Sequence, residues 1–205
     1  MMFWAIYLAA FFAGTAMMVR EGLWSNAISL INILVSGLVA FAFYSPMAIY
    51  LDEMTSGEYT YLMDFICIWT LFVVAMVVSR GITALASKTR MRFKNPIDPV
   101  GGPLVGLVAA WALSAFVMAT LHTAPMGKAA FSGGLIHSDS DVQSKSALFA
   151  PDLGWLRFVE TVTHSDAFGF RGRKGFLAGP FVRIYADHRE KYDQASPPYI
   201  RVRRG

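Results

Sequence analysis

The chain has 205 residues, of which 55% are hydrophobic and only 16% charged, with a net charge of +4. A typical soluble domain is about 25% charged, so this composition, with a mean hydropathy of +0.45, excludes a soluble enzyme as the simplest interpretation. The only cysteine, Cys67, cannot form an internal disulfide or a cysteine-based metal site, and the basic balance of an apolar chain indicates contact with lipid headgroups rather than with nucleic acid.

The predicted elements begin with four apolar helices. Residues 1–19, 22–51 and 99–127 carry no charge, and residues 59–79 carry only Asp64. A membrane-spanning helix needs roughly 20 apolar residues. These stretches are apolar all round, whereas strands of an outer-membrane barrel alternate apolar and polar residues. We therefore expect four transmembrane helices, at about residues 3–19, 23–44, 61–86 and 100–121.

Two features limit the first two spans. The first span has no Lys or Arg before it, whereas a signal peptide carries positive charge there, so we expect it to be retained. Pro46 follows the second span. Because proline cannot donate a backbone hydrogen bond and clashes with the preceding turn, we expect it to end or kink that helix.

The loops between the spans differ in charge and predict the topology. Arg20 follows the first span and a basic cluster at residues 88–94 follows the third, whereas the loop at residues 51–59 is acidic. Lys and Arg near span ends favour the cytoplasmic side. The first and third loops should therefore be cytoplasmic, and the amino terminus and the tail should lie on the periplasmic side.

Residues 125–205 have a different composition and contain most of the basic residues. We expect an extramembrane tail with a flexible linker at residues 132–146 and short helices at 153–162 and 181–192, the first of them capped by Asp152. The predicted fold is thus all-α: a four-helix transmembrane domain at residues 1–124, followed by a partly ordered tail.

The second span carries a polar stripe. Ser25, Ser29, Asn32 and Ser36 are spaced by four, three and four residues, which places them on one helix face, and Asn26 flanks this stripe. Lipid cannot satisfy such groups, so they should face other helices or water. Two interpretations remain open: hydrogen bonding between helices, or a polar path that contacts a substrate.

The fourth span carries small residues at a four-residue spacing. Asp98 precedes Gly102, Gly106 and Ala110 on one face. Small residues at this spacing let helix backbones approach closely, so we expect helix packing, within the chain or between copies, with a hinge or pore as the alternative. Asp98 is expected either to cap this helix or to act as a functional charge, such as a proton or partner site.

The sequence gives no indication of a catalytic, cofactor or metal site. The histidines are His122, His137, His164 and His188, and none is spaced from another His, Cys or Glu as metal ligands are. Asp64 is expected at the membrane interface, since a proton relay needs a second ionisable residue at membrane depth.

The joint after the first span resembles that of the colicin V production protein family of bacterial inner-membrane proteins. That family typically shows Arg-Gly-Phe-x-Arg-Glu-Ala-x-Ser-Leu at this joint, and the chain matches it at Gly22, Ala27, Ser29 and Leu30. Ser25 and Asn26 replace the usual Arg-Glu pair. Before the fourth span the family shows Asp-Arg and then spaced glycines, and the chain has Asp98-Pro99 followed by Gly102 and Gly106. The resemblance covers about residues 1–124.

The resemblance implies a multi-pass protein of the bacterial inner membrane. It would support the production or export of a peptide toxin and envelope function, without catalysis. Its partners would be membrane lipids and a second copy or other membrane proteins. The alternative is a small oligomeric transporter or channel, whose path would follow the polar stripe of the second span.

Overall fold

The computed structural model describes residues 2–55, 60–87, 97–127, 131, 134–165 and 175–194. Throughout these residues the regular structure is helical, and no strand occurs among them. Four long helices come first: α1 (Met2–Met18), α2 (Leu23–Met54), α3 (Thr60–Ala86) and α4 (Ile97–Thr120), which runs into a 3-10 turn, η1 (Leu121–Thr123). The shorter helices α5 (Asp139–Ser144), α6 (Pro151–His164) and α7 (Ala178–Gln194) follow.

The length and composition of the long helices are those of membrane spans. Helices α2, α3 and α4 are long and apolar enough to cross a bilayer, and α1 is a shorter apolar helix of 17 residues. The helices begin close to the residues that the sequence predicts, and their length and composition fit a multi-pass membrane protein. A full crossing by α1, and therefore a total of four spans, stays a prediction.

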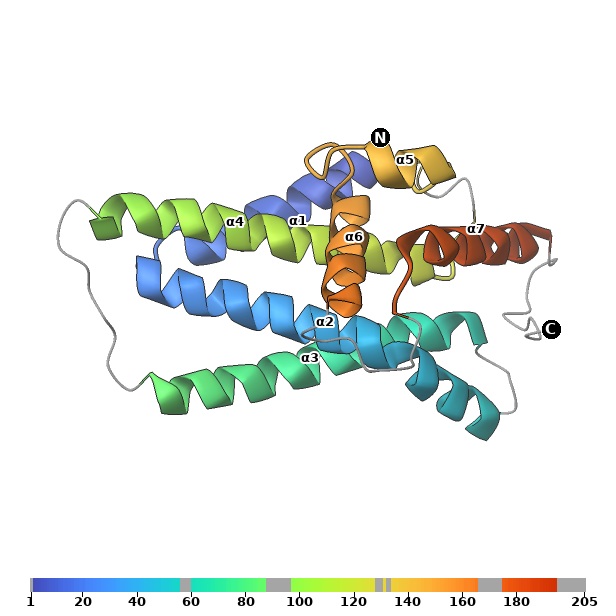
Figure 1. Ribbon diagram of the computed structural model, residues 1–205, viewed down its shortest axis with the longest axis horizontal. Coiled ribbons are helices and arrows are strands. Elements are labelled where there is room, and N and C mark those ends of the chain that lie inside the picture. Colours follow the sequence, from blue (N-terminus) through green and yellow to red (C-terminus); the bar gives the residue numbers. More distant parts are fainter. Residues whose placement is uncertain are drawn as a thin grey trace.

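Helices α1 to α4 lie side by side in one bundle (Figure 1). Helix α2 packs against both α3 and α4, and α1 packs against α4. The joint between α1 and α2 lies at the same end of the bundle as the start of α4, whereas α7 and η1 lie at the opposite end (Figure 1). The two ends therefore bring together different segments of the chain.

Pro46 does not end α2. The helix continues to Met54, so the end expected near residue 44 was wrong, and of the two effects expected of Pro46 the structure shows the kink. A proline removes one backbone hydrogen bond and favours a bend, and the last turns of α2 bend away from its main axis (Figure 1). In the last turn of α2, the Asp52 carboxylate accepts a hydrogen bond from Thr60 Oγ1 at 2.7 Å and joins the end of α2 to the start of α3. The basic cluster at residues 88–94 lies outside the described residues.

The tail helices pack into the core of the bundle. One hydrophobic cluster combines Phe41 of α2 and Phe116 of α4 with Trp155 of α6 and Phe181 of α7. Helix α6 crosses the long helices at a steep angle (Figure 1) and packs on α4. The predicted helices at 153–162 and 181–192 are confirmed, but the boundary placed at residue 124 does not separate two hydrophobic cores.

The predicted flexible linker contains ordered structure. Residues 134–146 are described and include α5. This helix begins with a capping box, in which Ser138 Oγ accepts from the Asp141 N–H and the Asp141 carboxylate accepts from the Ser138 N–H. Such reciprocal bonds satisfy amides that a helix start leaves free. The prediction of a flexible segment was therefore wrong for these residues.

Candidate functional site

Several of the residues singled out in the sequence meet where the α1–α2 joint contacts the start of α4. Asp98 lies in the first turn of α4, and its Oδ1 accepts a hydrogen bond from the Leu23 N–H at 2.9 Å. Asp98 thus caps α2 rather than its own helix. The N-cap of α2 is Gly22, which has no side chain to cap with. A Cβ atom on Gly22 would lie 3.3 Å from both carboxylate oxygens of Asp98, so glycine leaves space for that carboxylate.

Asn26 joins the joint, α2 and α4 through its side-chain amide. Its Nδ2 lies 2.9 Å from the Met18 carbonyl oxygen, 2.8 Å from that of Gly102 and 3.3 Å from that of Glu21. The amide hydrogens therefore satisfy carbonyl groups at the end of α1 and inside α4. Buried polar groups that lack such partners cost free energy, so Asn26 fixes the mutual position of these segments.

The small residues of α4 form the contact face of this junction. Gly102, Gly106 and Ala110 are buried. A Cβ atom on Gly102 would lie 3.0 Å from the Glu21 carbonyl oxygen, and one on Gly106 would lie 2.9 Å from Asn26 Nδ2. A Cβ atom on Gly14 of α1 would lie 3.2 Å from that of Ala110. This face packs against α1 and the joint within the same chain.

The residues of the polar stripe on α2 differ in their hydrogen-bond partners and in their burial. Asn32 Nδ2 donates to Thr83 Oγ1 at 3.3 Å and links α2 to α3. Ser36 is buried, and its hydroxyl has no hydrogen-bond partner among the described residues. Ser25 and Ser29 are half-buried. Both asparagines thus bind neighbouring helices, as expected for helix association in a membrane.

Comparison of the sequence with protein families shows which family the chain belongs to. The family model described as Colicin V production protein matches residues 2–148. The chain belongs to this family. The match includes the joint, the glycines of α4 and α5, and so extends past residue 124, where the resemblance was expected to end. No curated protein and no solved structure matches the chain.

At the opposite end of the bundle, the structure brings together residues that the sequence analysis did not combine. His122 lies in η1, His137 precedes α5 and Asp152 lies in the first turn of α6. The Nε2 atoms of His122 and His137 lie 2.9 Å and 2.7 Å from the same oxygen, Asp152 Oδ2. Asp152 does not cap α6, whose N-cap is Ala150. Asp152 lies 30 residues after His122 and 15 residues after His137. These separations are too long for the sequence to indicate that the three side chains meet.

The pKa of Asp152 depends on its burial and on the two histidines that contact it. Burial by itself raises the pKa of the Asp152 carboxyl, but the hydrogen bonds and charges of His122 and His137 outweigh it and leave that pKa lowered. Arg189 of α7 is buried, and its Nη2 donates to the Leu135 carbonyl oxygen at 3.1 Å. Burial lowers the pKa of Arg189, while the nearby Asp152 raises it. The lowered pKa favours an ionised Asp152 carboxylate beside the two imidazoles, and Arg189 adds a positive charge in its neighbourhood.

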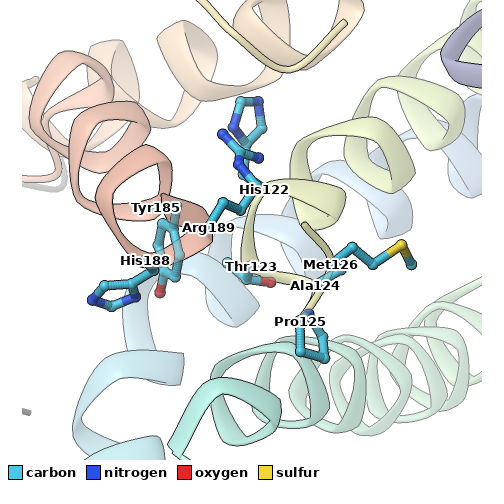
Figure 2. Close-up of a pocket in the computed structure, with 8 residues that line it drawn as sticks. All are labelled: His122, Thr123, Ala124, Pro125, Met126, Tyr185, His188 and Arg189. Atoms are coloured by element: carbon cyan, nitrogen blue, oxygen red, sulfur yellow. The ribbon is translucent and has the colours of Figure 1, made fainter. Parts of the chain in front are cut away.

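A small pocket borders this cluster at His122. Its wall consists of residues from η1, the turn after it and α7 (Figure 2): His122, Thr123, Ala124, Pro125, Met126, Tyr185, His188 and Arg189. Figure 2 shows the Arg189 guanidinium reaching toward the His122 ring. His122 therefore belongs both to the buried cluster and to the pocket wall.

Asp64 also has a partner that the sequence analysis missed. This residue of α3 is buried, and its Oδ2 accepts a hydrogen bond from the Tyr185 hydroxyl at 2.8 Å. Burial, Tyr44 and Asp64 raise the pKa of Tyr185 well above its ordinary value. The expectation that Asp64 lacks an ionisable neighbour was wrong, because α7 supplies a phenol 121 residues away in the sequence. Its position at the membrane interface stays a prediction.

Proposed function

We propose that this chain is a non-catalytic protein of the bacterial inner membrane that supports the production or export of a peptide toxin, and envelope function, by binding other membrane proteins. Membership of the Colicin V production family supports this role. The observation that carries it is the contrast between the inside and the outside of the bundle. The paired polar groups of the spans serve packing within the chain, and large apolar side chains remain outside.

The outer face of α3 illustrates this contrast. Val73, Val77 and Ile82 have exposed fractions of 52%, 66% and 61%. Such a surface suits lipid tails and the helices of partner proteins, since helices in lipid associate by van der Waals packing. We place the tail on the periplasmic side, because the basic cluster at residues 88–94 favours the cytoplasm for the opposite end of the bundle.

One observation favours a second candidate, an oligomeric transporter or channel. The buried Ser36 hydroxyl lacks a partner among the described residues, and Ser25 and Ser29 are only half-buried on the same helix. A path along this stripe would need several copies of the chain, because one small bundle encloses little space. The two candidates predict different behaviour of the purified chain.

Photo-crosslinking in native membranes tests the proposal. A photoreactive residue at Val77, which is exposed on α3, should form discrete adducts with a membrane protein, whereas one at buried Phe116 should not. The purified chain in liposomes should show no solute flux. Flux without any partner, together with lipid adducts alone at Val77, would contradict the proposal and support the transporter.

A further inference from the structure

We propose that His122, His137 and Asp152 form a binding site for a transition-metal dication, with Zn²⁺ as the best match. This inference goes beyond the proposed function. Imidazole nitrogen and carboxylate oxygen are ordinary ligands of Zn²⁺ in proteins. One ligand atom from each of the three side chains lies within 4.8 Å of the others. A water molecule or another small ligand would complete a tetrahedral site.

The distances need little adjustment. Zn²⁺ binds nitrogen and oxygen at about 2.0–2.2 Å, which places tetrahedral ligand atoms roughly 3.3–3.6 Å apart. In the structure Asp152 Oδ2 is 2.9 Å from His122 Nε2 and 2.7 Å from His137 Nε2. Both imidazoles already point the same ring nitrogen at one carboxylate. Small side-chain rotations would open this triangle to the size that a metal ion requires.

The ligands come from segments that are held in place by packing. Asp152 lies on α6, whose Leu153, Trp155 and Leu156 belong to the main hydrophobic cluster. His137 follows Leu135, which packs with Phe3 of α1 in a second cluster. Metal sites bind tightly when their ligands are fixed before the metal arrives. Because packing fixes these segments, the fold itself places the histidines next to Asp152.

The hydrogen bonds within the cluster leave several of its polar atoms without a partner among the described residues. Asp152 is 0% exposed, yet its Oδ1 has no hydrogen-bond partner among the described residues. If both imidazoles donate from Nε2 to Oδ2, their Nδ1 atoms are acceptors without a donor, and both are buried. Unmatched buried polar atoms cost free energy. A metal ion that replaces the Nε2 protons could also be bound by Oδ1.

Arg189 indicates what the fourth ligand would be. Its guanidinium cannot bind a metal, and its charge opposes a dication near Asp152. An anionic fourth ligand, such as hydroxide or a carboxylate, would offset that charge. The pocket wall contains both His122 and Arg189 (Figure 2), so the pocket borders the cluster on the side of these two residues.

The test uses the full chain with a histidine-free tag, purified in mild detergent, stripped with a chelator and then dialysed against Zn²⁺. We expect about one Zn²⁺ per chain, and a visible spectrum of tetrahedral Co²⁺ when cobalt replaces zinc. His137→Gln keeps an amide that can donate to Asp152 but removes the imidazole ligand, and it should weaken Zn²⁺ binding by about tenfold or more. The control is His164→Gln, because His164 is exposed and its Nδ1 bonds the Glu160 carbonyl oxygen.

A wild-type chain that retains no Zn²⁺ and gives no Co²⁺ spectrum would overturn the proposal. Equal binding by wild type and His137→Gln would also overturn it. If the variant does not fold, thermal unfolding of the wild type decides: Zn²⁺ should raise its Tm reversibly and a chelator should restore the original value. No shift would mean that the cluster is only a hydrogen-bonded contact.

Discussion

The indole ring of Trp155 lies directly against the backbone of Gly37. A Cβ atom added to Gly37 would overlap Cζ2 and Cη2 of that ring. The same indole contacts Phe116 edge to face, with ring centroids 5.4 Å apart. The Trp155 ring of α6 can therefore reach the backbone of α2 only because residue 37 has no side chain. Together with the packing of α6 on α4, this contact joins the tail to the membrane helices.

Gly37→Ala should destabilise the protein. The added methyl group meets a rigid ring, and overpacking of a tight core typically costs about 1–3 kcal/mol. Gly81→Ala on α3 is the matched control, since a Cβ atom there would meet nothing within 4 Å, and it should be neutral or slightly stabilising. Thermal unfolding in one detergent measures both variants. Equal Tm values for the two would show that Trp155 does not occupy this position.

Removal of the tail should also destabilise the bundle. A chain that ends at residue 131 loses α6 and α7, and with them Trp155 and Phe181 from the shared core. A chain that ends at residue 194 keeps every described helix and serves as the control. Size-exclusion chromatography in detergent should show a folded peak for the control and aggregation for the shorter chain. A stable, monodisperse 1–131 chain would restore the separate tail that the composition predicts.

The positions of the helices could be predicted from the sequence, because hydrophobic length and helical spacing are local signals. The docking of α6 could not. The side chain that recognises Gly37 is 118 positions away, and nothing in the composition of residues 125–205 reveals a partner. Pro46 was expected to end or kink α2, and the sequence could not decide between these effects; one lost backbone hydrogen bond is not enough to stop a long apolar helix, so only the kink occurs.

Gly106→Leu should lower stability more than Leu107→Ala. Residue 106 faces Asn26 and the end of α1, where even a Cβ atom would be 2.9 Å from Asn26 Nδ2. Leu107 is 38% exposed and lies one position further around the helix. The first change should cost about 1–3 kcal/mol or more, and the second should cost less. Unchanged unfolding of Gly106→Leu would show that this face of α4 contacts lipid.

Stability at alkaline pH should depend on Tyr185. Its folded pKa is raised, so the neutral phenol contributes stability that is complete below the unfolded pKa of about 10 and is lost as pH rises toward the folded value. Tyr185→Phe should be less stable at neutral pH and should lose less stability between about pH 10 and 12. Tyr50→Phe, at an exposed residue of α2, is the control. Parallel pH curves for wild type and Tyr185→Phe would contradict the buried hydrogen bond to Asp64.

The two candidate sites differ in how visible they are in the sequence. Gly102 and Gly106 repeat at a helical period, so their role in packing could be inferred, and only the partner of Asp98 was misassigned. The cluster of His122, His137 and Asp152 combines three segments that meet only after α6 has docked. Spacing along the chain cannot indicate such a site, since tertiary packing alone creates it.

The most direct test of the central claim, a membrane bundle whose tail folds onto its periplasmic end, is cysteine labelling from outside intact cells. The probes are Ser56→Cys after α2, Gln143→Cys on α5 and Thr89→Cys after α3; positions 56 and 89 lie outside the described residues. An impermeant reagent should label positions 56 and 143 and should reach position 89 only after the membrane is opened. Labelling of position 89 alone would reverse the orientation, and labelling of only one of positions 56 and 143 would contradict the fold itself.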